Sequence, residues 1–482
     1  MSTVRFAVKF KRCAVVAMLL FAGCVASSGA MAQGAEETAL DRYVNTPDPH
    51  YAYELLHWND EAGYNTYVLE MTSQKWLDEE TVDRPIWKHW LVIVRPDEVD
   101  TNIGFLYIGA GNNTDDAPAQ ASPRIVALAQ ATNSVVGQLY MVPNQPLTFV
   151  WDETRKRYED EIIAYTWDKY LRGGDEKWPL RLPMTKSAVR AMDTITSFAA
   201  DDRLGNLTVD RFVVAGGSKR GWTTWTTAAV DDRVVAIAPI VIDMLNMEPS
   251  FIHHYEVYGR YAEAIRDYEE MKIMDWLGTP ENDALMKLVE PYEYRSRYTM
   301  PKFMINAAGD QFFIPDSSQF YFDDLPGEKY MRYVPNGDHG LGGTDALESL
   351  VAWYHAIVND VKRPEFSWTF DGDNTIRVTA EGEPSAVKLW RATNADARNF
   401  QLQTIGPAWA STDLRLGADG SYRGAVQVPL KGWTAFFVEL TYPSGTSVPF
   451  KFTTAVRVVP DVKPFKFRYS SKSDRAEPPK HR

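Results

Sequence analysis

Two patterns of hydrophobic residues divide the chain near residue 365. Before that point, short continuous apolar runs alternate with segments of helical periodicity. This alternation is typical of a parallel sheet covered by helices on both faces, because strands buried on both sides need apolar residues at every position. The predicted strands lie at residues 65–71, 87–95, 103–108, 134–142, 212–215, 234–242, 302–307 and 330–334.

Helical periodicity falls between these strands, at residues 125–130, 155–170, 186–200 and 347–358. Residues 244–300 interrupt the alternation with a stretch rich in Tyr, Glu and Met, which contains helical patterns at 255–276 and 282–289. We expect this insertion to lie over the carboxyl edge of the sheet as a lid. The sequence therefore predicts an α/β domain over residues 33–364.

From residue 365 the pattern changes to short segments of alternating apolar and polar residues, separated by turn signals such as Asp419-Gly420. The segments lie at residues 366–370, 375–379, 386–391, 422–428, 435–442 and 450–454. They predict an all-β sandwich of the immunoglobulin or fibronectin type over residues 365–469. Residues 470–482 are charged and are predicted to be a disordered tail.

The first 32 residues read as a signal peptide. Basic residues precede an apolar run over residues 14–25, which is too short for a membrane span, and Ala30-Met31-Ala32 has the form of an A-x-A cleavage site. The alternative is a lipoprotein attached through Cys24, although Phe21 fits the first position of a lipobox poorly. We expect a secreted or periplasmic protein.

Composition narrows the possible chemistry. Both cysteines, Cys13 and Cys24, lie in the predicted signal peptide, so a mature chain has no thiol for disulfides, catalysis or metal binding. The formal net charge of −13 disfavours nucleic acid and anionic membrane as partners. The 15 tryptophans and 24 tyrosines indicate aromatic-lined clefts as well as packing.

A serine stands between a buried strand and a predicted helix, in the segment Gly216-Gly217-Ser218. Strand, glycine turn, serine and helix form the layout of a nucleophile elbow, which exposes the hydroxyl at the carboxyl end of the sheet. The motif departs from the usual G-x-S-x-G, because Arg220 takes the place of the second glycine and Gly221 follows it. An ordinary glycine turn before a helix is the alternative interpretation.

Two later strand ends supply the rest of a charge relay. Asp310 follows a strand in a G-D-x-x-x-[IV]-P turn, which resembles the acid turn of α/β-hydrolases, and His339 lies in a glycine-flanked loop after the last strand. The order Ser218, Asp310, His339 matches the order of nucleophile, acid and base in that fold. Asp243 also ends a strand and is the rival for the acid.

Residues that follow the serine, and two in the turn at 109–113, have further predicted roles. The backbone amides of Lys219, Gly111 and Asn112 are predicted to form an oxyanion hole, while a plain turn at 109–113 is the alternative. The side chains of Lys219, Arg220 and Trp222 are predicted to bind substrate, and the two cations favour an anionic one. Pairing of both cations with acidic neighbours is the other interpretation. We expect no metal and no cofactor; a cation site at 112–116 is conceivable, but such loops are usually solvated turns.

Three segments carry a family resemblance: R-L-P-M-T-K-S-A-V-R-A-M-D-T at 181–194, G-G-S-K-R-G-W-T-T-W at 216–225 and A-I-A-P-I-V-I-D-M-L-N at 236–246. They resemble the PhoPQ-activated pathogenicity-related protein family, which is placed with the α/β-hydrolases. The resemblance implies that fold for most of the mature chain and implies no substrate. The G-x-S-K-x-G spacing is also similar, locally, to the G-C-S-R-x-G elbow of glucuronoyl esterases.

These features predict a secreted serine hydrolase that cleaves an ester or amide through an acyl-enzyme. Ser218 attacks the acyl carbon, His339 takes its proton and Asp310 orients His339. The substrate is a small molecule, a peptide or a carbohydrate ester, and an esterase is favoured over a serine peptidase. A non-catalytic secreted binding or signalling protein on a hydrolase fold is the alternative, because Arg220 alters the elbow.

Overall fold

A computed structural model describes residues 37–152 and 154–471. The predicted signal peptide, with its cleavage site and Cys24, and residues 472–482 of the predicted tail lie outside these residues. Throughout the two described ranges, no helix has both the length and the apolar character needed to cross a membrane.

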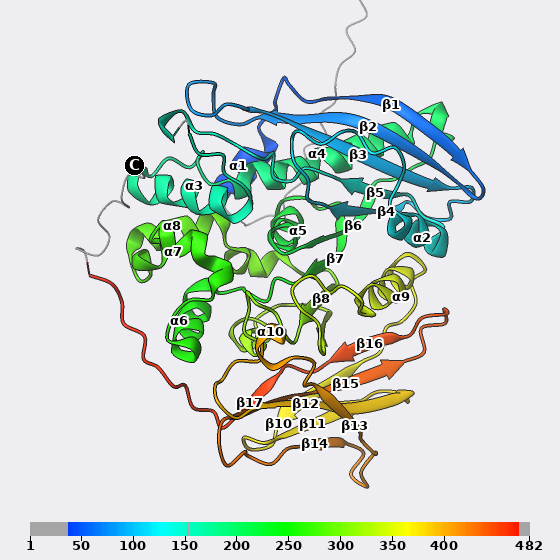
Figure 1. Ribbon diagram of the computed structural model, residues 1–482. Coiled ribbons are helices and arrows are strands. Elements are labelled where there is room, and N and C mark those ends of the chain that lie inside the picture. Colours follow the sequence, from blue (N-terminus) through cyan, green and yellow to red (C-terminus); the bar gives the residue numbers. More distant parts are fainter. Residues whose placement is uncertain (1–36, 153, 472–482) are drawn as a thin grey trace, which may run out of the picture. The chain divides into compact units, whose positions relative to one another are not determined.

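The main sheet has the strand order β1-β2-β3-β5-β4-β6-β7-β8-β9 (Figure 1). The strands β1 to β3 pair antiparallel, and the strands from β5 to β9 pair parallel. Their bounds are β1 Ala52–Glu61, β2 Tyr64–Lys75, β3 Ile86–Pro96, β4 Ile103–Ile108, β5 Val136–Leu139, β6 Arg211–Gly217, β7 Val234–Ile240, β8 Lys302–Ala307 and β9 Lys329–Val334. The sequence predicted each of these strands except β1.

Helices cover both faces of this sheet because successive strand residues point to opposite sides. On β6, Val213 and Ala215 pack with α2 (Pro123–Thr132) and α9 (Ala346–Val358). Phe212 and Val214 join the other core, with α3 (Glu159–Gly173), α4 (Arg181–Ala199) and α5 (Lys219–Val230). The continuous apolar runs of the sequence are therefore explained by two cores, one on each face.

A helix that the sequence did not predict begins the described chain. α1 spans Ala39–Asn45, in a mostly polar stretch of the sequence. Thr38 and Asp41 form a reciprocal capping box at its start, and Leu40 and Val44 are buried against the core. Two apolar residues at helical spacing were too weak a signal among the polar residues around them.

The insertion over residues 244–300 is helical; the helix predicted at 282–289 is confirmed, and the one predicted at 255–276 is not. It contains α6 (Met247–Tyr258), α7 (Arg266–Glu270) and α8 (Pro280–Val289), joined by turns of 3-10 helix. A single helix over 255–276 was expected; the structure ends α6 at Gly259, which takes a left-handed conformation with φ 70°. This glycine cap divides the predicted helix.

The C-terminal region consists of two groups of antiparallel strands. One is a separate sheet of β10 (Phe366–Phe370), β11 (Thr375–Ala380) and β14 (Tyr422–Ala425). The other contains β12 (Ala386–Asn394), β13 (Ala410–Asp413), β15 (Trp433–Tyr442), β16 (Phe450–Thr453) and β17 (Arg457–Val459). The two groups pack closely: a Cβ added to Gly424 of β14 would lie 2.9 Å from Val438 of β15.

The second group continues the main sheet, which the sequence did not predict. Thr453 of β16 pairs with Met331 of β9, and the Thr453 hydroxyl accepts the N–H of Tyr333 at 3.0 Å. The loop between β12 and β13 also reaches the main domain. It contains the short helix α10 (Leu402–Ile405), and the amide of Leu402 donates to the carbonyl of Gly309 at 2.9 Å.

After β17 the chain returns to the insertion as an extended segment, residues 460–471, which we call the C-terminal strap (red in Figure 1). The amide of Phe465 donates to the carbonyl of Glu256 in α6 at 3.0 Å. The Ser470 hydroxyl, in the predicted tail, donates to Asp275 of the insertion at 2.7 Å.

Candidate active site

Ser218 lies on a tight turn between β6 and α5. Its backbone has φ 56° and ψ −124°, a conformation that a residue with a side chain adopts only under strain. The Ser218 amide donates to the carbonyl of Ile240 at 2.8 Å, which ties the turn to the end of β7. This geometry is that of a nucleophile elbow.

The altered motif still has a glycine at each of the two positions where a side chain would collide with the backbone of the turn. A Cβ on Gly216 would lie 2.6 Å from the carbonyl oxygen of Arg220, and a Cβ on Gly221 would lie 2.9 Å from the carbonyl oxygen of Gly216. The glycine needed after the serine is therefore Gly221, one position later than in the usual motif. Arg220 stands at the position where the usual motif has its second glycine. Its side chain donates to the carbonyl of Val142 and to the carboxylate of Glu159.

Asp310 and His339 form a hydrogen-bonded pair beyond the ends of β8 and β9. The Nδ1 atom of His339 lies 2.8 Å from Oδ2 of Asp310, whose side chain is 3% exposed. The Asp310 carboxylate also accepts the N–H of Phe312 at 2.7 Å, and the ring of Phe312 lies 4.2 Å from the His339 ring between centroids. An acid held in this way fixes the orientation of the imidazole.

The sequence did not anticipate the role of Gln311, the residue that follows Asp310. Its side-chain oxygen accepts the main-chain N–H of His339 at 2.9 Å. Gln311 therefore joins the acid turn to the loop that carries the histidine. No sequence pattern marks such a contact, because it depends on the approach of two loops.

Asp243, the rival acid, has other partners. It is buried and accepts hydrogen bonds from the hydroxyls of Tyr321 at 2.6 Å and Tyr333 at 2.7 Å. Burial raises the pKa of Asp243 to about 7, against the lowering effect of the two hydroxyls. The contact with His339 thus belongs to Asp310.

The three proposed relay residues follow parallel strands β6, β8 and β9, whose carboxyl ends meet at one edge of the sheet. Within the ranges that the structure describes, the Ser218 hydroxyl makes no hydrogen bond to the His339 ring. Catalytic hydrogen bonds in ligand-free enzymes are often long and tighten only when substrate binds.

The predicted oxyanion amides differ in their availability. Lys219 is the first residue of α5, where a backbone N–H has no acceptor within the helix. Gly111 has φ 140°, but the neighbouring amide of Asn112 donates to the Asp115 carboxylate at 2.7 Å. Asn112 is therefore engaged within its own loop, and Lys219 and Gly111 remain as candidate donors.

The side chains predicted to bind substrate have protein partners instead. The Lys219 ammonium lies 2.9 Å from Glu159 and 3.0 Å from Asp160, and Arg220 lies 2.6 Å from Glu159. The Trp222 indole donates to the carbonyl of Val289 at 2.6 Å. All three are buried, so they hold the elbow against α3 and the insertion.

Glu159 is the residue that sequence reasoning missed here. Burial alone would raise its pKa, but the charges of Lys219 and Arg220 outweigh burial and lower the pKa to about 2. Its φ of 48° is unusual for a residue other than glycine, and its backbone amide donates to the side-chain oxygen of Gln145 at 2.8 Å. Pairing of both cations with acidic neighbours was one interpretation of the sequence, but no pattern singled out Glu159 as the partner.

Over residues 37–152 and 154–471, no group of three or more His, Cys, Asp and Glu side chains has a geometry that could hold a metal ion. Asp115, from the conceivable cation site, caps its own loop through Asn112.

Comparison with known proteins identifies relatives of the chain. The autocrine proliferation repressor protein A of Dictyostelium discoideum is 37% identical over 457 residues, covering 89% of this chain and 92% of that protein. Similar solved structures include acetyl xylan esterase 1 from Thermoanaerobacterium sp., with 13% identity, a TM-score of 0.47 and coverage of 66% of this chain and 92% of that one. A glucuronoyl esterase from Solibacter usitatus has 12% identity, a TM-score of 0.39 and coverage of 67% and 91%.

The family model described as PhoPQ-activated pathogenicity-related protein matches residues 40–401, which span the α/β domain and reach α10's loop in the C-terminal region. The resemblance found in the three sequence segments is thereby confirmed. The chain belongs to the PhoPQ-activated pathogenicity-related protein family.

Proposed function

We propose that this protein is a serine hydrolase that cleaves an ester or amide through an acyl-enzyme. The observation that carries the proposal is the 2.8 Å pair between His339 and Asp310 at the same sheet edge as Ser218 on its strained turn. A nucleophile, an oriented base and an acid in this order are the parts that the chemistry requires.

In the proposed mechanism, Oγ of Ser218 attacks the acyl carbon while Nε2 of His339 takes its proton. Asp310 holds Nδ1–H of the ring and stabilises the imidazolium. The amides of Lys219 and Gly111 donate to the developing oxyanion. His339 then protonates the leaving group, and a water molecule activated by the same ring releases the acid from Ser218. The steps need no cofactor.

Three further parts of the proposal concern the substrate, the export of the chain and the C-terminal strands. The substrate is an ester rather than a peptide, and it does not depend on Lys219 or Arg220 for charge, because Glu159 and Asp160 together compensate both cations. The chain is exported by a signal peptide over residues 1–32, with lipid attachment at Cys24 as the alternative. The C-terminal strands form a sandwich of the immunoglobulin type that serves for packing or binding.

A specific observation also favours a second function, that of a secreted signalling protein without turnover. The relative from Dictyostelium discoideum, 37% identical over nearly its whole length, bears the name of an autocrine proliferation repressor. A chain of this kind could use the hydrolase fold as a binding scaffold.

Labelling with a fluorophosphonate probe distinguishes the two functions, because the probe reacts with an activated serine. We expect the wild-type protein to be labelled and the Ser218→Ala variant not to be labelled. Ser367→Ala, which removes an exposed serine on β10, is the matched control and keeps full labelling. A folded wild-type protein that resists the probe would support the signalling function.

A further inference from the structure

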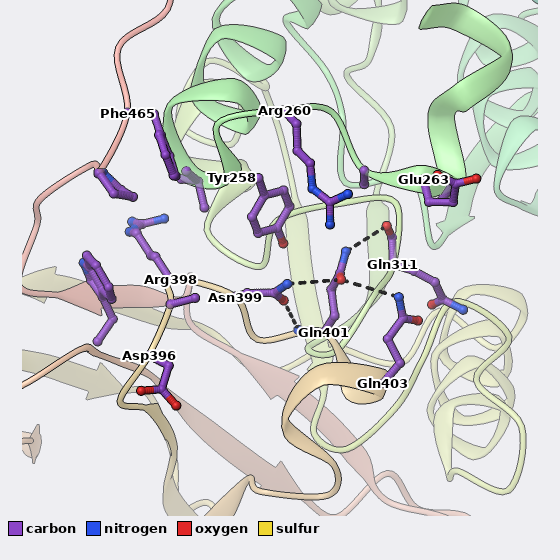
Figure 2. A pocket seen from close by; sticks show the side chains of 16 residues that line it. Tyr258, Arg260, Glu263, Gln311, Asp396, Arg398, Asn399, Gln401, Gln403 and Phe465 are labelled. Atoms are coloured by element: carbon purple, nitrogen blue, oxygen red, sulfur yellow. Dashed lines mark hydrogen bonds between the residues drawn. The ribbon is translucent and has the colours of Figure 1, made fainter.

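A cavity of about 490 Å³ borders the proposed acid turn (Figure 2). Its walls come from the end of α6 and the segment after it, from the loop between β12 and β13, and from the C-terminal strap. Gln311 also lines the cavity, and its side-chain oxygen holds the amide of His339 at 2.9 Å. The cavity and the proposed base thus share one residue.

Side-chain amides dominate one wall of this cavity. Gln401 occupies its centre, where its oxygen accepts from Asn399 at 3.3 Å and from Gln403 at 3.5 Å, and its nitrogen donates to the carbonyl of Gln311 at 3.1 Å (Figure 2). The side-chain oxygens of Gln311 and Gln401 are therefore both used by protein donors. The wall presents more N–H donors than acceptors, which favours a ligand rich in oxygen.

A buried arginine on the same wall has unused donors. Arg398 is 2% exposed, and its Nη2 atom lies 2.6 Å from Asp316, which also bonds to His253 at 3.0 Å. Among the residues that the structure describes, Nε and Nη1 of Arg398 have no hydrogen-bond partner. A buried guanidinium with free N–H groups is a preferred partner of carboxylates.

The charges at the rim add to this preference. Arg260 extends from the insertion toward Gln401 and Gln311 (Figure 2). The acidic residues at the rim are balanced by cations: Asp396 pairs with Lys431 at 2.8 Å and Glu263 with Arg266 at 3.0 Å. The cavity itself is lined by two cations, Arg260 and Arg398, of which Arg398 is paired with Asp316 through one of its nitrogens.

Aromatic residues complete the lining. Tyr258, Trp433 and Phe465 come from the insertion, the C-terminal strands and the strap, respectively. Flat apolar faces beside a small set of polar groups are typical of pockets that orient a ring-shaped ligand. A sugar ring has apolar C–H faces and a polar edge, so it matches both the aromatic residues and the amide wall.

We propose that this cavity binds an acidic sugar, one that carries a free carboxylate, within an esterified carbohydrate. The carboxylate faces Arg398 and Arg260, and the hydroxyls face the amides around Gln401. The ester bond in this substrate rests on the proposed hydrolase function, whereas recognition of the sugar rests on the cavity alone.

Isothermal titration of the full-length Ser218→Ala protein tests the proposal without turnover. The ligands are trigalacturonic acid, the neutral sugar maltotriose, and triglutamate, a peptide with a similar number of carboxylates. We expect saturable binding of trigalacturonic acid, and binding of the other two weaker by about tenfold or more, since a hydrogen bond to a charged group has about this value.

Two variants locate the binding site. Arg260→Ala, at an exposed position, is expected to weaken the binding of trigalacturonic acid by about tenfold. Arg415→Ala, an exposed arginine away from the cavity, is the control and leaves binding unchanged. Arg398→Gln is expected to weaken binding further; because it also breaks the pair with Asp316, an unfolding curve accompanies it.

The proposal is overturned if trigalacturonic acid does not saturate the protein, if triglutamate binds as tightly, or if Arg260→Ala has no effect. A different result is expected if the proposed hydrolase function is wrong. In that case the fluorophosphonate probe leaves the wild type unlabelled, while binding that depends on Arg260 persists and identifies a sugar-binding protein.

Discussion

The Nζ atom of Lys219 lies 2.9 Å from Oε2 of Glu159, so the cation that follows the proposed nucleophile is neutralised from helix α3. Arg220 shares the same carboxylate. Removing this one acid would leave two buried cations with reduced compensation, which is costly in an interior of low polarity.

We therefore expect Glu159→Gln to lower the free energy of unfolding by about 2 kcal/mol, less than for a fully buried partner because the Glu159 side chain is 33% exposed. Denaturant unfolding curves measure the change. Glu263→Gln, which removes an exposed partner of Arg266, is the control and should change little. Equal effects of the two substitutions would contradict the role given to Glu159.

Substitution of the two aspartates separates the acid from its rival. Asp310→Asn is expected to lower kcat by about 10⁴-fold, because an amide there favours the wrong tautomer of His339. Asp243→Asn should leave kcat within about tenfold, since Asp243 contacts Tyr321 and Tyr333 rather than the histidine. Kinetics with an ester that the wild type cleaves, or the rate of fluorophosphonate labelling, provide the measurement.

The two glycines before the serine have different space around them. A Cβ on Gly216 would collide with the backbone of Arg220, whereas a Cβ on Gly217 would have nothing within 4 Å. We expect Gly216→Ala to destabilise the protein by about 1–3 kcal/mol and to abolish labelling of Ser218. Gly217→Ala should fold and react. If the alanine at 216 is tolerated as well as the one at 217, the proposed geometry of the elbow is wrong.

Buried acids give the stability of the protein a defined pH dependence. Burial raises the pKa of Asp243 to about 7 and that of Glu290 to about 8, so the folded state keeps protons that the unfolded state loses near pH 4. Their contribution to stability is full below about pH 4 and falls as the pH rises to about 8. Burial also lowers the pKa of His89 to about 4 and that of His254 to about 3, which acts in the opposite direction but only below about pH 6.5.

The two effects oppose each other below about pH 6.5. Burial also lowers the pKa of Lys186 and that of Lys302 to about 8, which acts against the acids as the pH approaches 8, so the acids dominate between about pH 6.5 and 7.5. We expect the free energy of unfolding to fall across that interval, by at most about 1.4 kcal/mol per pH unit for each proton. Glu290→Gln should reduce this slope, whatever its effect on absolute stability. Unfolding curves at half-unit steps of pH test the prediction, and a flat or rising profile in the wild type would refute it.

The sequence predicted the part of the fold that local patterns encode. Runs such as Phe212-Val213-Val214-Ala215 identify buried strands on their own, and Ser218, Asp310 and His339 stand out because each follows such a run. The structure places Asp310 and His339 in contact, which agrees with the expected pair. The roles of these residues in catalysis stay a prediction.

What could not be predicted depends on contacts between distant segments. Glu159 has the sequence context of a solvated helix face, and only the position of α5 makes it a partner of Lys219. The pairing of Thr453 with Met331 joins the C-terminal strands to the main sheet. The hydrophobic pattern changes near residue 365, so the sequence alone indicates two separate regions. Gly259 fits a helix interior poorly, but its role is clear only when Phe465 is seen against it.

The C-terminal strap connects the far end of the chain to the insertion through two aromatic rings and two glycines. A Cβ on Gly259 would lie 2.7 Å from the ring of Phe465, and one on Gly278 would lie 2.8 Å from the ring of Tyr469. The absence of a side chain at each glycine thus leaves the space that the aromatic ring occupies. Any outward movement of the insertion must withdraw both rings from the glycines or move the strap with it, so residues 460–471 restrain the part of the insertion that lines the cavity.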